Sequence, residues 1–522
     1  MSIGCWQVIG ARRLATLRHL LILAGILLAG CERAVTPEMA EARRPNIVIL
    51  FADDMGYGDP SSYGHPTILT PNIDRLAAEG QRWTDFYVAA PVCSPSRGAL
   101  LTGKLPVRSG LYGRQLRVMF PDDPGGIPDD ETTLAEFLNS AGYATGIFGK
   151  WHLGDKPEAL PTRHGFDRWF GVPYSNDMRW TVGLTTTELI AARIAGQMTQ
   201  YNETLALRLK LTFAPKSEYW NIPLMISAAN ASGHDDQVIE QPADQTLLTK
   251  KYTQAAAEFI AEQAAADKPF FIYLPYSMPH IPLFPSADFS GHSRAGRYGD
   301  VIEEIDWSVG RIRAALEAAG VADNTLLMVT SDNGPWLTMR HHGGSAGPLS
   351  NGKGTVFEGG MRVPAVFWWP GHIQPGVVHD IGSTLDLYAT AAELAGVALP
   401  EGAATDSISL AATLLEGAPG SRSSLAYYRG HELQAFRKDQ YKAMFISEGS
   451  YGDPPQRTLH NTPLLFDLDQ DPGERYEISD QMPQVVAQLL AAAAEHRASF
   501  TQAKPIFDAR LAASSNAGNE AK

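Results

Sequence analysis

The chain has 522 residues, and at roughly 150 residues per domain this length predicts two or three folding units. With 44% hydrophobic and 19% charged residues, the composition is typical of a globular enzyme and excludes a polytopic membrane protein or a low-complexity chain. The net charge of −14 argues against nucleic acid as a partner. If the chain binds an anion, a metal ion, lysine or arginine must supply positive charge inside the site.

The first 30 residues predict an export signal, because a basic stretch at residues 12–18 precedes an apolar run at residues 20–28 that is too short for a comfortable membrane span. The run ends in LAGC at residues 28–31, which resembles the bacterial lipoprotein cleavage box, so Cys31 is expected to become the lipidated first residue. An ordinary secretory signal is the alternative, and Arg12-Arg13 leave twin-arginine export open. We therefore expect an exported protein, lipid-anchored to a bacterial membrane and facing the periplasm or the cell surface.

The folded part is expected to begin near Pro45 with a buried strand. Residues 46–51 (NIVILF) are largely apolar and rich in β-branched side chains, which is typical of a central strand buried on both faces. This strand runs almost directly into Asp53 and Asp54. A helix is then predicted from Pro71, which suits the first turn of a helix.

Helices and strands continue to alternate along the chain. Helices are predicted at residues 134–139, 252–266 and 301–319, and strands at residues 143–148, 270–274 and 325–330. This alternation predicts an α/β fold with a large, mostly parallel sheet flanked by helices. Asp53, Asp54, Asp332 and Asn333 follow predicted strands, at the edge where open α/β sheets bind ligands, so we expect them to converge.

Two later regions differ from this pattern. Residues 180–245 lack a regular period and predict a long irregular insertion near the site. Residues 434–445 (QAFRKDQYKAMF) are typical of an antiparallel hairpin, so we predict a smaller C-terminal antiparallel sheet, closed by a helix at residues 483–497. The expected domains are a lipoprotein signal peptide at 1–30, a tether at 31–44, a catalytic α/β domain at 45–376, a C-terminal subdomain at 377–510 and a disordered tail at 511–522.

Cysteine usage singles out Cys93. Of the three cysteines, Cys5 lies in the predicted signal and Cys31 at its end, so Cys93 is the one internal thiol. It begins the sequence CSPSRGALLTG, which resembles the signature of the sulfatase family, Cys-x-Pro-Ser-Arg followed by Leu-Thr-Gly. The resemblance implies that a formylglycine-generating enzyme oxidises Cys93 to formylglycine, whose hydrated aldehyde attacks a sulfate monoester. A geminal diol suits this reaction because its second hydroxyl can expel sulfate and restore the aldehyde, whereas a serine would leave a stable ester.

The resemblance extends over roughly residues 45–480, is closest to the arylsulfatase A group and implies an alkaline-phosphatase-like fold. The sequences FADDMGYGD at residues 51–59 and SDNG at residues 331–334 resemble the two metal motifs of the family. They imply a metal site formed by Asp53, Asp54, Asp332, Asn333 and one oxygen of the modified Cys93. Such an all-oxygen site suits Ca²⁺ better than Mg²⁺. Without the second motif, two adjacent aspartates would be equally typical of a solvated turn.

Other motifs imply the residues that handle the substrate. The sequence GKWHLG at residues 149–154 contains Lys150 and His152. The resemblance implies that Lys150 holds the sulfate and that His152 is the base. If this segment is extended, both side chains lie on the same side of it. His280 is implied to bond the leaving-group oxygen, and Lys353, in GKGTVFEGG, to bind sulfate oxygens. On their own, a lone histidine is more often structural and a lysine between glycines more often solvated.

Two weaker assignments complete the set. Arg97 is implied to fix the modified cysteine and to neutralise the metal carboxylates, and Ser175, in PYSND, to contact the substrate. The acid that protonates the leaving group stays open between Asp332 and His280. Residues 180–245, 336–345 and the hairpin near His431 are expected to shape the leaving-group pocket.

The resemblance implies a sulfuric ester hydrolase that acts on an aryl or carbohydrate sulfate, a sulfated small molecule or glycan. The nearest alternative is a phosphonate or phosphate ester hydrolase of the same superfamily, because related enzymes share the formylglycine signature. A noncatalytic surface lipoprotein that binds sulfated glycans through an unmodified Cys93 is the rival from another class, although a binding module has no need of the complete catalytic set.

Overall fold

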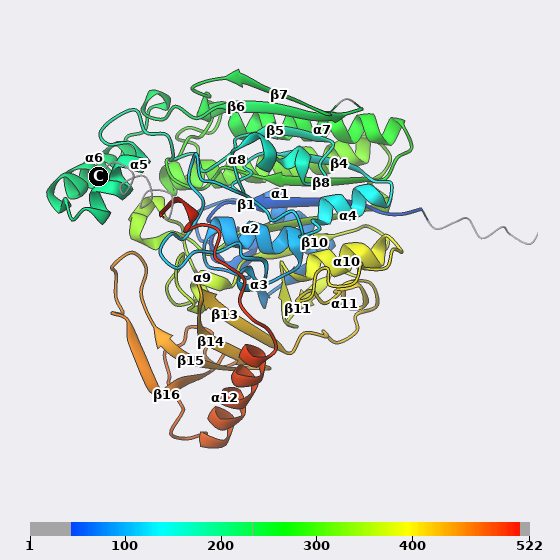
Figure 1. Cartoon of the computed structure of the whole chain (residues 1–522). Coiled ribbons are helices and arrows are strands. Elements are labelled where there is room, and N and C mark those ends of the chain that lie inside the picture. Colours follow the sequence, from blue (N-terminus) through cyan, green and yellow to red (C-terminus); the bar gives the residue numbers. More distant parts are fainter. Residues whose placement is uncertain (1–42, 232, 512–522) are drawn as a thin grey trace, which may run out of the picture. The chain divides into compact units, whose positions relative to one another are not determined.

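A ten-stranded mixed sheet forms the centre of the fold (Figure 1). The computed structural model describes residues 43–231 and 233–511, so the expected signal peptide, the lipidation of Cys31 and nearly all of the tether and tail lie outside the described residues. The strand order is β11-β2-β10-β9-β1-β8-β4-β5-β6-β7. The strands are β1 (Asn46–Ala52), β2 (Gln81–Trp83), β4 (Ala144–Phe148), β5 (Arg168–Gly171), β6 (Leu224–Asn230), β7 (Gly233–Glu240), β8 (Phe270–Pro275), β9 (Thr325–Ser331), β10 (Ala365–Trp368) and β11 (Gly376–Val378).

The central strands are parallel, as the alternation of helices and strands predicted. Strand β1 pairs in parallel with β8 on one side and β9 on the other, and all seven of its residues are buried. Phe51 is in register with Pro275, and Ala52 with Ser331, so the three strands end at the same edge of the sheet. The residues that follow them are therefore brought together at that edge.

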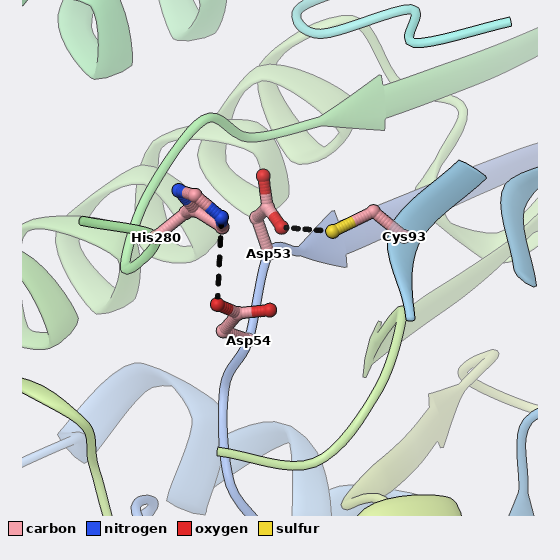
Figure 2. A group of neighbouring side chains, drawn as sticks. All are labelled: Asp53, Asp54, Cys93 and His280. Atoms are coloured by element: carbon pink, nitrogen blue, oxygen red, sulfur yellow. Dashed lines mark hydrogen bonds and ion pairs between the residues drawn. The ribbon is translucent and has the colours of Figure 1, made fainter. Parts of the chain in front are cut away.

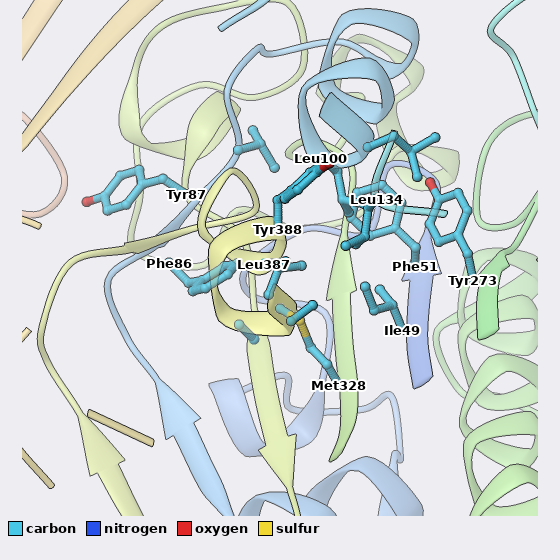
Figure 3. Close-up of a cluster of buried hydrophobic side chains, with 14 of the residues drawn as sticks. Ile49, Phe51, Phe86, Tyr87, Leu100, Leu134, Tyr273, Met328, Leu387 and Tyr388 are labelled. Carbon is cyan, nitrogen blue, oxygen red and sulfur yellow. The ribbon is translucent and has the colours of Figure 1, made fainter. Parts of the chain in front are cut away.

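Helices cover both faces of the sheet because the side chains of β1 alternate between two apolar cores. Val48 and Leu50 pack with apolar residues of α1 (Pro71–Glu79), α7 (Leu248–Ala265) and α8 (Gly296–Ala318). Ile49 and Phe51 pack on the other face with α2, α4 and α10, in the cluster drawn in Figure 3. These helices are α2 (Cys93–Thr102), α4 (Leu134–Ser140) and α10 (Asp386–Leu394). The predicted α/β fold class is confirmed.

The smaller C-terminal antiparallel sheet is also confirmed. It has the order β13 (Ser424–Arg429), β14 (Glu432–Lys438), β15 (Tyr441–Ser447) and β16 (Thr458–Asp467), and α12 (Pro483–Ala498) contacts β14 and β15. Among the described residues, those from Arg44 onward cluster as one compact unit, and the division at residues 376 and 377 stays a prediction. Short elements elsewhere in the chain include β3 (Phe86–Tyr87), α3 (Pro106–Ser109), α9 (Glu358–Met361), β12 (Gly382–Ser383) and α11 (Ala411–Glu416).

The expectation of an irregular segment at residues 180–245 is wrong. This segment forms α5 (Thr186–Ile194), α6 (Met198–Phe213) and the antiparallel pair β6–β7, which extends the large sheet. Helix α5 begins with a capping box in which Thr185 and Glu188 bond each other's backbone N–H groups. The sequence pattern failed in α6 because large apolar side chains such as Leu205 and Leu209 stay exposed. No helix of the described residues is long and apolar enough to cross a membrane.

Candidate active site

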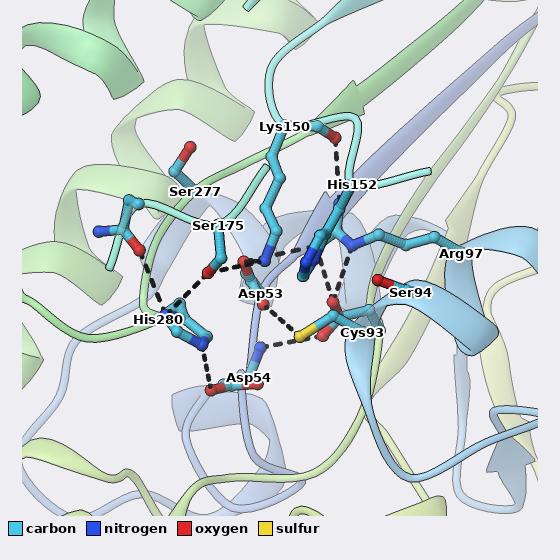
Figure 4. A network of polar contacts seen from close by, with 12 residues as sticks. Asp53, Asp54, Cys93, Ser94, Arg97, Lys150, His152, Ser175, Ser277 and His280 are labelled. Carbon is cyan, nitrogen blue, oxygen red and sulfur yellow. Dashed lines mark hydrogen bonds and ion pairs between the residues drawn. The ribbon is translucent and has the colours of Figure 1, made fainter. Parts of the chain in front are cut away.

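The chemically active side chains converge at one edge of the large sheet (Figure 4). Most of them come from a segment that follows a central strand, as the parallel register requires. Asp53 and Asp54 follow β1, Lys150 and His152 follow β4, His280 follows β8, Asp332 and Asn333 follow β9, and Cys93 begins α2. Ser175, Arg97 and Lys353 contact these residues, so every predicted site residue in the described part of the chain has a place in this cluster.

Cys93 is held between a carboxylate and a lysine. Its side chain is 2% exposed, its Sγ donates to Asp53 Oδ1 at 3.4 Å, and Lys353 Nζ lies 3.5 Å from the Sγ. Burial, together with the negative charge of Asp53, raises the pKa of the Cys93 thiol well above its usual value. The unmodified side chain is therefore a protonated thiol at neutral pH and a poor nucleophile.

Three buried aspartates face three cations. Lys150 Nζ lies 2.5 Å from Asp53, Lys353 Nζ lies 2.7 Å from Asp54, and Arg97 Nη2 lies 2.7 Å from Asp332. Burial, aided by the charges of Asp53 and Asp332, raises the pKa of Asp54 to about 7 in spite of Lys353. Burial and the charge of Asp53 also raise the pKa of Asp332. For Asp53, burial is outweighed by nearby positive charge, first that of Lys150, and the pKa is lowered.

The donor atoms suit a divalent cation. Asp53, Asp54, Cys93 and His280 each offer one ligand atom, and these atoms all lie within 4.8 Å of one another (Figure 2). Asn333 Oδ1 is buried and has no hydrogen-bond partner among the described residues, while its Nδ2 donates to Asp54 Oδ1 at 2.7 Å. An unpartnered amide oxygen beside carboxylates is a group that a hard cation satisfies.

The structure arranges Asp332 differently from the other predicted ligands. Its Oδ2 accepts hydrogen bonds from Arg97, at 3.0 Å from Nε and 2.7 Å from Nη2, and its Oδ1 accepts from the backbone N–H of Asp54 at 3.0 Å. It lies outside the group of four ligand residues, in which His280 stands instead. Asp332 thus fixes Arg97 and the Asp54 backbone whether or not it also contacts a cation.

A hydrogen-bonded chain links Lys150 to His280. Lys150 Nζ donates to Ser175 Oγ at 3.2 Å, and Ser175 Oγ lies 3.3 Å from His280 Nδ1. His280 Nδ1 also lies 2.6 Å from the carbonyl oxygen of Ile281, which assigns the proton of a neutral ring to Nδ1. His280 Nε2 then faces Asp54 Oδ2 at 3.8 Å with a free lone pair.

His152 reaches the cluster by a route that the sequence pattern did not predict. Strand β4 ends at Phe148, and His152 has a φ of 63°, so the expectation of one extended segment carrying Lys150 and His152 is wrong. Gly149 permits the turn, because a Cβ there would lie 1.9 Å from the carbonyl oxygen of Pro275. His152 Nε2 lies 2.9 Å from the carbonyl oxygen of Met119, which leaves Nδ1 buried and without a partner among the described residues. Burial, followed by the charge of Lys150, lowers the pKa of His152, so its free ring nitrogen is a proton acceptor.

The sequence did not single out the aromatic side chains beside Lys353. The ring centre of Trp336 lies 4.4 Å from Lys353 Nζ, 5.0 Å from the ring centre of Tyr451 and 5.4 Å from that of His280. Trp336 belongs to a segment that we expected to shape the pocket, whereas no local signal marks Tyr451, which lies between β15 and β16. A separate cavity of about 220 Å³ against β13 and α12 contains none of the predicted site residues.

Comparisons with known proteins find relatives over most of the chain. A family model described as sulfatase matches residues 45–397, and one described as the C-terminal region of aryl-sulfatase matches residues 420–519. The chain is 42% identical to arylsulfatase A of Bos taurus over 88% of each chain, and 39% identical to N-acetylgalactosamine-6-sulfatase of Sus scrofa over 89% of this chain and 86% of the relative. The solved structure of PsFucS1 sulfatase from Pseudoalteromonas sp. matches with a TM-score of 0.74 and 29% identity, over 87% of this chain and 90% of that one.

Proposed function

Because the chain belongs to the sulfatase family and is a sulfuric ester hydrolase, we propose that it cleaves an aryl or carbohydrate sulfate with a formylglycine made from Cys93 and one Ca²⁺ ion. Membership of this family implies a formylglycine and a divalent metal ion. The observation that carries the proposal is the position of Cys93, the first residue of α2, between Asp53 and Lys353. The thiol itself is buried and protonated there, so the reaction needs the modified residue.

The charges around Cys93 suit a sulfuryl group. Lys150 and Lys353 bind the sulfate oxygens and offset the negative charge that grows on them in the transition state, and such preorganised charge usually gives the largest share of the rate enhancement. When present, the hydrated aldehyde supplies the nucleophile and the metal ion polarises it. Arg97 holds Asp332 and keeps the carboxylates in place.

Two histidines handle protons on opposite sides of the reaction. His152 accepts a proton through Nδ1, the ring nitrogen that has no partner among the described residues. For the leaving group, we favour His280 over Asp332, because both oxygens of Asp332 already accept hydrogen bonds. His280 faces the site through Nε2, and it can donate to the leaving-group oxygen once this nitrogen has taken up a proton.

Calcium is proposed over magnesium because of the number and kind of donors. Asp53, Asp54 and Asn333 offer several oxygens, and a formylglycine at position 93 would replace the sulfur by oxygen. Ca²⁺ takes six to eight oxygen ligands in adaptable geometry, whereas Mg²⁺ requires a near-ideal octahedron and keeps several waters.

The substrate proposal rests on the relatives. One relative is an arylsulfatase and another an N-acetylgalactosamine-6-sulfatase, so both aryl and carbohydrate sulfates enter the proposal. The reaction releases inorganic sulfate and an alcohol or phenol. The aromatic rings of Trp336 and Tyr451 offer a surface on which the ring of either leaving group can stack.

We also propose that the protein is exported, matured by a formylglycine-generating enzyme and anchored through lipid on Cys31. The sequence pattern of residues 12–31 supports export and lipidation. Labelling of cells with a fatty-acid analogue tests the anchor: the wild type should carry the label and Cys31→Ala should not. Equal labelling of both proteins would contradict it.

Mass spectrometry of the peptide that carries Cys93, from protein purified from its native host, tests the nucleophile. We expect formylglycine in place of cysteine, and loss of aryl sulfate hydrolysis in Cys93→Ala. A wholly unmodified thiol in an active enzyme would overturn the proposal. The rates on matched aryl sulfate and aryl phosphonate esters complete the test, since faster turnover of the phosphonate would favour the alternative activity.

A further inference from the structure

An unpaired guanidinium lies beside the Lys353 loop. Arg117 is partly buried, its Nη1 is buried without a hydrogen-bond partner among the described residues, and no described carboxylate forms an ion pair with it. The buried arginines Arg97 and Arg362, in contrast, form ion pairs, with Asp332 at 2.7 Å and with Asp85 at 2.6 Å. A buried donor without a partner costs free energy, so its retention calls for a partner that binds from outside.

Arg117 borders the surface on which the leaving group would lie. Its Cζ lies 4.9 Å from the ring centre of Tyr451. The ring of Tyr451 in turn contacts that of Trp336, and Trp336 contacts Lys353. A Cβ on Gly354, the residue after Lys353, would lie 3.2 Å from Arg117 Nη1. Tyr451 is 45% exposed, so its ring is open to solvent between the lysine and the arginine.

The positive charge at this position is in excess. Arg429 is neutralised by Glu448, whose Oε2 lies 2.9 Å from its Nη1. Burial, followed by the charge of Arg117, lowers the pKa of Arg429 to about 10, which shows that the two guanidinium groups repel each other. Glu448 pairs with Arg429 and no described carboxylate pairs with Arg117, so an anion bound at Arg117 would reduce this repulsion.

We propose that Arg117 is a specificity residue that binds a second anionic group, a carboxylate or a second sulfate, on the leaving group of the substrate. The sulfate to be cleaved lies at Lys353, the ring of the leaving group stacks on Trp336 and Tyr451, and the second anion pairs with the planar guanidinium fork of Arg117. This inference rests on the proposed function and narrows its substrate class to sulfate esters with two or more negative charges.

A kinetic comparison tests this role. The probes are a sulfated uronate disaccharide, its carboxyl-reduced counterpart, and the reduced disaccharide with a second sulfate. We expect the wild type to prefer one dianionic probe over the reduced probe about tenfold in kcat/KM, and Arg117→Gln to lose that preference. Arg114→Gln is the matched control, because Arg114 lies three residues away on the same segment with its side chain exposed, and it should keep the preference.

Which dianionic probe is preferred distinguishes a carboxylate from a sulfate. A wild type without preference, or an Arg117→Gln variant that keeps it, would overturn the role of Arg117 while leaving the sulfatase activity in place. If the wild type cleaves none of the probes and no aryl sulfate, the proposed function itself fails.

Binding gives a second readout that does not need turnover. Calorimetry compares the full-length Cys93→Ala variant with the double variant that also carries Arg117→Gln. The double variant should bind the preferred probe about tenfold more weakly, whereas both proteins should bind inorganic sulfate with the same affinity. Equal loss for both ligands would mean that Arg117 only supports the Lys353 loop, which would contradict the proposal. The effect of Arg117 should shrink at high salt, because the pair is partly exposed.

Discussion

Two buried lysines, Lys353 and Lys442, lie in ionic clusters of similar composition but different completeness. Lys353 contacts Asp54 in the active site. Lys442, on β15, lies 2.9 Å from Glu358 Oε1 and 2.8 Å from Glu474 Oε1, and its Nζ donates to the carbonyl oxygen of Val356 at 2.8 Å. The second cluster thereby fastens the end of the Lys353 loop to the C-terminal sheet.

The Lys442 cluster is almost closed. Glu358 also accepts hydrogen bonds from Tyr87, at 2.6 Å, and from Tyr427, at 3.1 Å, and Arg362 lies 3.6 Å away. Burial opposes the ionisation of Glu358, but the surrounding positive charge, first that of Lys442, lowers its pKa to about 2. Its charge is neutralised from within the protein.

The active-site cluster is open by comparison. Asn333 Oδ1 and His152 Nδ1 are buried and have no partners among the described residues. A cation, the modified cysteine and a substrate can supply the partners that these polar atoms lack within the protein. Similar buried ions thus serve structure where they are paired and chemistry where they are not.

The largest effect is expected from removal of the lysine in the closed cluster. Lys442→Met should lower the free energy of unfolding by about 3–5 kcal/mol, because Glu358 and Glu474 would lose the lysine they share. Urea unfolding measures this loss. The exposed Lys438, on the neighbouring strand β14, supplies the control, and Lys438→Met should change stability by less than about 0.5 kcal/mol. A loss below about 1 kcal/mol for Lys442→Met would contradict the structural role.

The same substitution in the open cluster should act on catalysis. Lys353→Met is expected to lower kcat/KM on an aryl sulfate about 10²–10³-fold, as removal of a transition-state donor does. The free energy of unfolding should change much less than in Lys442→Met, because Asp54, with a pKa of about 7, can bind a proton, whereas Glu358, with a pKa of about 2, stays ionised. Steady-state kinetics and urea unfolding of both variants test this prediction. An equal loss of unfolding free energy in Lys353→Met and Lys442→Met would contradict it. Lys156→Met, at a surface ion pair, serves as the control.

Glu474 should give the closed cluster a pH dependence. Burial raises its pKa to about 7 in the folded protein, against an ordinary value near 4.5. The folded state then holds the proton more tightly than the unfolded state, so this contribution to stability is complete below pH 4.5 and is lost as the pH rises to about 7. Glu474→Gln lacks this loss, and relative to the wild type it should gain about 2–3 kcal/mol of unfolding free energy between pH 5 and pH 8.

Unfolding of the wild type and of Glu474→Gln at both pH values measures this gain. The exposed Glu495→Gln is the control and should follow the wild type at both pH values. Parallel pH profiles for Glu474→Gln and the wild type would show that Glu474 titrates as an ordinary carboxyl group.

Calcium should stabilise the folded protein by binding to the carboxylates of the active-site cluster. At a concentration of 100 times its Kd, Ca²⁺ should stabilise the wild type by about 2.7 kcal/mol, with a smaller effect of Mg²⁺ at the same concentration. Asp54→Asn should lose this response, whereas Asp288→Asn, at an exposed site, should keep it. Thermal unfolding with and without each ion is the measurement. Equal stabilisation of Asp54→Asn would place the calcium site elsewhere.

Much of the fold and site followed from the sequence because the signals are local. The apolar run of β1, the helix start at Pro71 and the strand before Asp332 are set by neighbouring residues, and parallel register then brings the strand ends together. The motif around Cys93 likewise lies within a few residues. Local patterns failed where backbone geometry departs from the period, as at His152, and where apolar residues of α6 stay exposed.

Local sequence signals were therefore sufficient to predict the α/β architecture, the family, and the residues that converge around Cys93. The folded structure was needed to show which carboxylate Arg97 pairs with, that Lys442 joins Glu358 to Glu474, and that Arg117 lies unpaired over the ring of Tyr451. The reason is physical: propensity and hydrophobic period act between neighbours in the chain, whereas the pairing of charges and the gaps left in it depend on side chains that only folding brings together.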